Sequence, residues 1–190
     1  MIDDLKKQYK VVKKELISSY TEGYIGKNTY KVTLANGREF KIEQILKNKR
    51  NGDAVVIIPI TTDNKYVLII EARPNVKEEV VLSFPAGMID EGEEAVDAAK
   101  RELEEETGYI AKELIELEEH YQDQGCSSAI IKTYLAVGCE KKSKTHLDEN
   151  ENLTSVLVTD EELDDMYNNG EIKSANGKIA YMTYKMKKGR

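Results

Sequence analysis

The sequence predicts an α/β fold in which helices cover a mixed β-sheet, preceded by a small N-terminal antiparallel β extension. Strand-like segments lie on both sides of one central helical segment, and a further helical pattern closes the chain. This order favours layers of helices packed on a sheet. With 190 residues, the chain is long enough to bury the core of one domain. We expect the extension at residues 1–50 and the main domain at residues 51–190.

Three segments rich in β-branched and aromatic residues predict the strands of the extension: 11–20, 30–34 and 38–46. Asn36 and Gly37 separate the last two, and an Asn-Gly pair is a strong hairpin signal. We therefore expect an antiparallel unit before the main domain. A second Asn-Gly pair, Asn51 and Gly52, marks the boundary between them.

In the main domain, apolar and β-branched runs predict strands at 54–60, 66–71, 80–84, 113–121, 129–137 and 153–158. The segment 113–119 is also compatible with a helix. Helices are predicted at 93–107, from the capping box of Thr159 and Glu162 to about residue 169, and at 174–188. The polar segments 122–128 and 141–152 are expected to be loops.

The composition limits the possible partners. With 35 acidic and 28 basic residues, the net charge of −7 argues against a nucleic-acid-binding surface. No apolar run approaches the length of a membrane span, and the first ten residues lack the apolar stretch of a signal peptide. We expect a cytoplasmic protein. The two cysteines, Cys126 and Cys139, are expected to be structural.

The predicted helix 93–107 concentrates carboxylates. Residues three or four apart share a helix face, so Glu102, Glu105 and Glu106 are expected to point the same way. Three crowded carboxylates repel one another unless a cation neutralises them. Hard oxygen ligands suit Mg²⁺, with Mn²⁺ as an alternative, and Mg²⁺ also binds substrate phosphates. The plainer interpretation is a solvated acidic helix face.

The spacing of the whole motif favours the metal site. The chain reads Gly87, five residues, Glu93, seven residues, Arg101-Glu102-Leu103, one residue, Glu105-Glu106, one residue, Gly108 and Tyr109. With seven fixed residues, a chance match is on the order of 10⁻⁸ per window. The pattern resembles the Nudix box, whose final position is usually aliphatic rather than tyrosine. The resemblance implies an α/β/α sandwich and a metal-dependent pyrophosphohydrolase.

Beyond the box, the chain most resembles the ADP-ribose pyrophosphatase branch of this family. The strands that end in an Asn-Gly turn, the run AVVIIPI, the sequence FPAG and the later LDENEN segment occur in the expected order. The chain departs from the branch at Gln124, where proline is common, and at Ser83, where glutamate is common. Glu71 and Ala72 also stand where glutamine and an aromatic residue are common.

The resemblance implies roles for the residues of the box. The backbone carbonyl of Ala86 with Glu102 and Glu106 would bind the metal, and Glu105 would bind or bridge a second one. Gly87, Glu93 and Arg101 would support the site, and Arg101 and Glu105 are expected among the catalytic residues. The general base would lie on the later acidic loop. Glu149 and Glu151 are its two candidates, with a slight preference for Glu149.

The resemblance also implies substrate contacts and a dimer. Arg73 matches an arginine that reaches substrate phosphate, although a surface ion pair is the alternative. An adenine ring would need an aromatic platform, for which the extension offers Tyr20, Tyr24 and Tyr30. Gly125, in the loop after the box, is a further predicted substrate contact. The extension would bind substrate and form a homodimer.

The predicted function is Mg²⁺-dependent hydrolysis of the pyrophosphate bond of a nucleoside diphosphate linked to another moiety. ADP-ribose, which would yield AMP and ribose 5-phosphate, is the preferred substrate. The alternatives are a pyrophosphatase for another nucleotide sugar or a dinucleotide, and a nucleotide sensor that does not hydrolyse its ligand. A sensor would be expected to lose carboxylates of the box, and this chain retains all of them.

Overall fold

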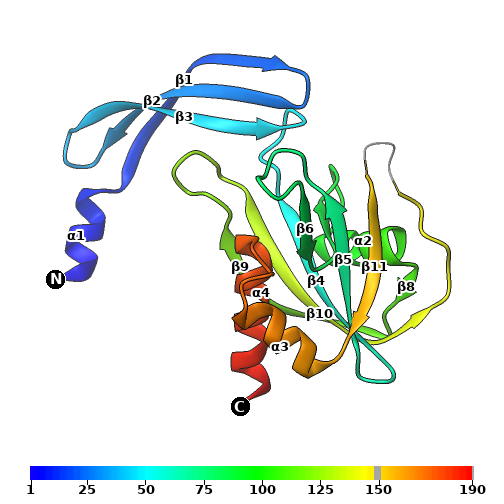
Figure 1. The fold of residues 1–190 in the computed structure, drawn as a ribbon. Coiled ribbons are helices and arrows are strands. Elements are labelled where there is room, and N and C mark those ends of the chain that lie inside the picture. Colours follow the sequence, from blue (N-terminus) through cyan, green and yellow to red (C-terminus); the bar gives the residue numbers. More distant parts are fainter. Residues whose placement is uncertain (148–150, 190) are drawn as a thin grey trace. The chain divides into compact units, whose positions relative to one another are not determined.

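The computed structural model describes residues 1–147 and 151–189, which form two compact units (Figure 1). The first unit comprises Met1–Gly52 together with Tyr121–Ala129, and the second comprises Asp53–His120 and Ile130–Arg190. The segment 121–129 therefore belongs to the N-terminal unit, although it lies far along the chain.

The first unit contains a three-stranded antiparallel sheet. Its elements are α1 (Ile2–Gln8), β1 (Val11–Glu22), β2 (Ile25–Leu34) and β3 (Glu39–Lys47). The hairpin turn is confirmed: Gly37 has a φ of 84°, and Asn36 Oδ1 accepts the N–H of Arg38 at 3.0 Å. The short helix α1 was not predicted, because seven residues are too few to show a helical apolar period.

The later segment joins this unit through hydrogen bonds. The backbone N–H of Ile45 donates to the carbonyl of Cys126 at 2.7 Å. The buried Gln44 side chain donates to Ser128 Oγ at 2.5 Å. These bonds explain why a loop between two strands of the second unit is part of the first.

The second unit contains the mixed sheet, with strand order β11-β5-β4-β10-β8. β4 and β10 are parallel, and the remaining described registers are antiparallel. β6 pairs with β5, β7 with β4, and β9 with β10. The strands are β4 (Ala54–Thr61), β5 (Tyr66–Ala72), β6 (Val80–Ser83), β7 (Ala86–Met88), β8 (Tyr109–Ile110), β9 (Glu113–Tyr121), β10 (Ile130–Lys141) and β11 (Leu153–Val158).

Three helices cover this sheet: α2 (Ala95–Thr107), α3 (Asp160–Asn168) and α4 (Ala175–Lys188). Alternate residues of β4 pack into the cores on the two faces of the sheet, because successive side chains of a strand point to opposite faces. Val55 and Ile57 pack in the core that includes α2 residues, and Val56 and Ile58 pack in the core that includes residues of α3 and α4. The predicted α/β/α arrangement is confirmed.

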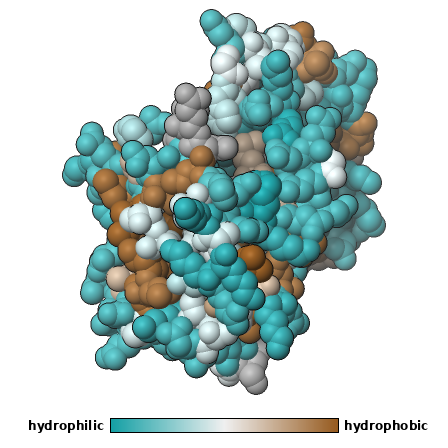
Figure 2. All heavy atoms as spheres, turned by 90° about the vertical axis from the view of Figure 1, so that its right-hand side faces the viewer, coloured by the Kyte–Doolittle hydropathy of each residue, from teal (hydrophilic) through white to brown (hydrophobic). Residues whose placement is uncertain are grey.

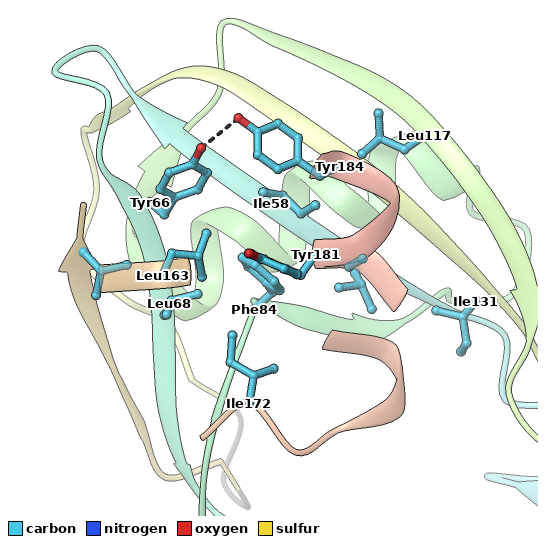
Figure 3. Close-up of a cluster of buried hydrophobic side chains, with 13 residues drawn as sticks. Ile58, Tyr66, Leu68, Phe84, Leu117, Ile131, Leu163, Ile172, Tyr181 and Tyr184 are labelled. Carbon is cyan, nitrogen blue, oxygen red and sulfur yellow. Dashed lines mark hydrogen bonds between the residues drawn. The ribbon is translucent and has the colours of Figure 1, made fainter. Parts of the chain in front are cut away.

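The core on the α4 side contains a hydrogen bond between two tyrosine hydroxyls (Figure 3). The hydroxyls of Tyr66 and Tyr184 point toward each other and lie 2.7 Å apart. Tyr66 also donates to Asp160 at 2.8 Å, so the buried hydroxyl is satisfied. The contact joins β5 to α4 and to the first residue of α3.

The predicted helix ends are largely confirmed. α2 ends at Gly108, which adopts a left-handed φ of 72°, and the capping box of Thr159 and Glu162 opens α3. Ser174 caps α4 through the N–H of Gly177. The start of α2 is two residues later than predicted. The short strand Ala86–Met88 was not among the predicted strands, and it forms because it pairs with β4.

The face drawn in Figure 2 is predominantly polar. Figure 2 shows hydrophilic residues over most of the face that it presents, with apolar residues in smaller groups. Among the described residues, no helix is both long and apolar enough to cross a membrane.

Candidate active site

Helix α2 separates the three predicted carboxylates by exposure. Glu102 and Glu106 lie on the buried side, with exposed fractions of 7% and 2%. The Glu105 side chain is 40% exposed. The three carboxylates are therefore neighbours on the helix, but only two have lost most of their contact with water.

Arg101 connects these carboxylates to the segment before the helix. Its guanidinium donates to both oxygens of Glu93 at 2.9 Å, to Glu102 at 2.7 Å and to Glu105 at 3.1 Å. It also donates to the backbone carbonyl of Met88 at 3.0 Å. The hydrogen bonds from Arg101 hold the pKa of Glu93 below its ordinary value. The supporting positions predicted for Glu93 and Arg101 are thus in direct contact.

Burial dominates the electrostatics of the other two glutamates. It raises the pKa of Glu106 to about 9, with the Glu102 charge adding to the effect and the N–H of Ala86, 3.0 Å away, opposing it. Burial likewise raises the pKa of Glu102 to about 7, against the opposing pull of Arg101. The protein holds two carboxylates where negative charge is unfavourable, and a cation would relieve that cost.

Within residues 1–147 and 151–189, no group of three or more His, Cys, Asp or Glu side chains is arranged to hold a metal ion. Arg101 donates one hydrogen bond to Glu102 and one to Glu105. The donor types nevertheless fit a hard divalent cation, since buried carboxylates with raised pKa values gain most from one. Arg101 bonds to Oε1 of Glu102, which would leave Oε2 as an acceptor for a cation.

Gly87 lies against Glu102. A Cβ atom at position 87 would fall 1.9 Å from Glu102 Cδ, far inside any van der Waals contact. The glycine therefore permits β7 to approach α2 at the predicted metal ligand. This close approach gives Gly87 its supporting role.

The two predicted general bases differ in what the structure describes. Glu149 lies outside the described residues. Glu151 precedes β11, and its negative charge contributes to raising the pKa values of Glu71, Glu102 and Glu106. Glu151 thus lies within electrostatic reach of the buried carboxylates.

Arg73, the predicted phosphate contact, follows β5 and pairs with Glu71 at 2.8 Å. Arg73 is mostly exposed and Glu71 is buried. Burial raises the pKa of Glu71, and the positive charge of Arg73 opposes this shift. Glu71 was not among the predicted site residues. A lone glutamate in the apolar run YVLIIEA was the signal that could have indicated it.

Three predicted substrate contacts lie in the first unit. Tyr24 is exposed, and the Lys14 ammonium lies 4.1 Å from the centre of the Tyr30 ring. The N–H of Gly125 donates to Asp123 at 3.1 Å. The carboxylates of α2 lie in the second unit. The substrate roles of these three residues stay predictions.

Comparison with known proteins supports the interpretation of the motif. The NUDIX domain model matches residues 50–176. The chain is 32% identical over 151 residues to an ADP-ribose pyrophosphatase of Bacillus subtilis (strain 168), covering 79% of this chain and 78% of that protein. It is 36% identical over 129 residues to a methanol dehydrogenase activator of Bacillus methanolicus, covering 67% of each.

The fold is also similar to a solved structure. The crystal structure of an ADP compounds hydrolase superposes with a TM-score of 0.78 at 25% sequence identity. The match covers 96% of this chain and 95% of that one. The similarity therefore extends beyond the segment that the domain model matches.

We expect Gly87→Ala to weaken Mn²⁺ binding by at least about tenfold, because the added methyl group would displace the Glu102 carboxylate. Electron paramagnetic resonance of free Mn²⁺ measures the affinity, and circular dichroism checks the fold. Gly189→Ala is the matched control, since its Cβ would meet only ordinary contacts. Unchanged Mn²⁺ affinity in folded Gly87→Ala would contradict a metal role for Glu102.

Proposed function

The chain belongs to the Nudix family, and we propose that it hydrolyses the pyrophosphate bond of ADP-ribose to give AMP and ribose 5-phosphate. The observation that carries this proposal is the group of carboxylates on α2, in which Glu102 and Glu106 are buried. Arg101 links Glu105 of this helix to Glu93 before it. The similarity to an ADP-ribose pyrophosphatase and to an ADP compounds hydrolase supports the choice of substrate.

In this proposal the Ala86 carbonyl, Glu102 and Glu106 hold Mg²⁺, and Glu105 serves a second ion. When bound, Mg²⁺ would neutralise the negative charge of the pyrophosphate and lower the pKa of a water molecule that it binds. Arg101 keeps Glu105 and Glu93 in position through its hydrogen bonds. The mostly exposed Arg73 reaches the substrate phosphate by leaving its ion pair with the buried Glu71.

We assign the general base to Glu151. This proposal is supported by the negative charge of Glu151, which contributes to raising the pKa values of Glu71, Glu102 and Glu106. A base must lie within hydrogen-bond reach of the attacking water when substrate is bound. Glu151 lies two residues before the start of β11, which pairs with β5.

Incubation with Mg²⁺ and a panel of ADP-ribose, other nucleotide sugars, NADH and dinucleoside polyphosphates tests the function. We expect the highest kcat/KM for ADP-ribose, with AMP and ribose 5-phosphate identified by chromatography. Glu106→Gln serves as the control and should lose most of kcat, because it removes a ligand charge. Absence of turnover would overturn the proposal, and tight binding without hydrolysis would identify a sensor. Near-normal activity of Glu106→Gln would refute the metal role.

A matched pair of variants tests the base. We expect Glu151→Gln to lower kcat by about 10²–10⁴-fold, the usual contribution of a general base, and Glu149→Gln to remain near wild type. Steady-state kinetics with saturating Mg²⁺ provides the measurement, with Mn²⁺ binding as a check that the metal site survives. The reverse result, with the loss confined to Glu149→Gln, would move the base to that residue.

We also propose a homodimer formed through the first unit. All twelve residues of β1 are exposed, among them Val12, Leu16 and Ile17, and β1 is an edge strand of its sheet. A long, exposed and partly apolar edge strand is usually covered by a partner. A second copy of the chain is the partner that the family resemblance favours.

Sedimentation velocity tests the dimer. We expect a species of twice the chain mass of 21.5 kDa, and we expect Leu16→Lys to shift it toward monomer. Leu157→Lys on β11 is the matched control, because that residue is similarly exposed in the second unit. A wild-type monomer at micromolar concentration would end the proposal.

The proposed location is the cytoplasm. Cys126 and Cys139 are both free thiols, and Cys139 is buried. Free cysteines are the usual state in a reducing compartment, where disulfides are rare.

A further inference from the structure

The segment that follows β10 is bonded to the C-terminal end of helix α2. The last carbonyls of an α-helix have no partner within the helix and need one outside it. The N–H of His146 donates to the Glu105 carbonyl at 2.8 Å, and the N–H of Lys142 donates to the Gly108 carbonyl at 3.0 Å. Residues 142–146 are therefore attached to the backbone of the helix that carries the proposed metal ligands.

Gly108 permits the close approach of this segment. A Cβ atom at position 108 would lie 2.4 Å from the carbonyl oxygen of Ser143, which is closer than two such atoms can lie. The strand register brings the segment to this place, because Lys141 at the end of β10 pairs with Tyr109 in β8. Backbone lies directly against backbone here, so the position of the segment relative to α2 is well defined.

A second attachment lies just beyond Glu151. The carbonyl of Asn152 accepts the N–H of Ala72, at the end of β5, at 3.0 Å. Leu153, the first residue of β11, pairs with Glu71. The half-buried Glu151 is thus one residue from a bonded backbone position, and neighbouring Cα atoms are about 3.8 Å apart.

The two attachments refer Glu151 to two parts of the proposed site. The bond of His146 leads to α2, and the bond of Asn152 leads to the strand that ends beside Arg73. Holding both ends of a short connection removes many of the conformations that a chain held at one end could adopt. A general base needs such restriction, because it must lie within hydrogen-bond reach of the attacking water.

We propose that His146 is a positioning residue for the general base. Its backbone N–H, bonded to the carbonyl of Glu105, holds the segment that leads to Glu151 in register with α2. The exposed imidazole of His146 is not required for this role. The inference rests on the proposed function and on Glu151 as the base, and it adds a group that acts without touching the substrate.

Steady-state kinetics of His146→Pro with ADP-ribose and saturating Mg²⁺ tests the inference, because proline has no N–H to donate. We expect kcat to fall about 10- to 100-fold, since misplacing a catalytic group by about 1 Å can cost this much. KM and Mn²⁺ affinity should stay within about threefold of wild type. His146→Ala retains the N–H and should recover the kcat that His146→Pro loses.

Lys144→Pro is the matched control. It places proline in the same segment, at an N–H that donates no hydrogen bond within the described residues, and it should keep the wild-type kcat. A kcat of His146→Pro within about threefold of wild type would overturn the inference. A parallel loss of Mn²⁺ affinity would also overturn it, because the bond would then support the metal ligands on α2 instead of the base.

The double variant His146→Pro/Glu151→Gln separates positioning of the base from general damage. If His146 acts through Glu151, the double variant should have a kcat no more than about twofold below that of Glu151→Gln alone, because the effects of coupled residues are not additive. Losses that multiply in the double variant would show that His146 acts independently of Glu151, contrary to the inference.

Gly108→Ala and Gly170→Ala provide a second test that does not depend on how proline is tolerated. Both glycines have a left-handed φ, 72° and 75°, but a Cβ at position 170 meets nothing within 4 Å. The two variants therefore share the backbone strain, and only Gly108→Ala displaces Ser143. We expect kcat at least about tenfold lower in Gly108→Ala than in Gly170→Ala, at equal Mn²⁺ affinity. Equal kcat values in the two folded variants would count against the inference.

Amide hydrogen exchange, followed by nuclear magnetic resonance, tests the bond without turnover. In wild-type protein the amide of His146 should exchange at least about tenfold more slowly than that of Lys144, because a hydrogen-bonded amide must open first. Equal protection of the two amides would contradict the inference even in an active enzyme. The proposed function fails separately, when wild-type protein hydrolyses no member of the substrate panel.

Discussion

The hydrogen bonds of Arg101 organise the candidate site. One guanidinium holds Glu93 and Met88 before the helix and Glu102 and Glu105 within it. A lysine at this position could not reproduce these contacts, because it lacks the planar fork of donors. The site is therefore preorganised by an ion pair network that includes one oxygen of Glu102. If Glu102 binds a cation as proposed, its carboxylate would serve both Arg101 and that cation.

Strand β4 both contributes to the two hydrophobic cores and positions the backbone of β7 beside the glutamates of α2. Its alternating side chains enter the two cores on opposite faces of the sheet, and its pairing with β7 brings Ala86 and Gly87 to α2. The apolar sheet thereby places a backbone segment against two glutamates that have little contact with water. The raised pKa values of Glu102 and Glu106 follow from this packing. Stability and chemistry thus depend on the same strand.

Elements with a strong local signal were predicted from the sequence. Gly108 and the box of Thr159 and Glu162 end or begin helices through contacts within a few residues. β7 and β8 have three and two residues, too few for any period, and they form because partner strands lie beside them. The membership of Glu71 in the site likewise depends on tertiary packing. The helical spacing of the sequence predicted that Glu102, Glu105 and Glu106 are neighbours on α2. Only the structure shows that Glu102 and Glu106 are buried whereas Glu105 is exposed.

The discontinuous first unit constrains the order in which the protein matures during synthesis. Domains generally fold as units while the chain emerges, N-terminal first. Here residues 1–52 emerge early, but the carbonyl of Cys126 that accepts from Ile45, and the Ser128 hydroxyl that accepts from Gln44, are made much later. The three strands of the N-terminal sheet pair within residues 11–47, but these two bonds to the later segment can form only after β4 to β9 have been synthesised. A nascent chain stalled before residue 121 would carry an N-terminal unit without its last segment.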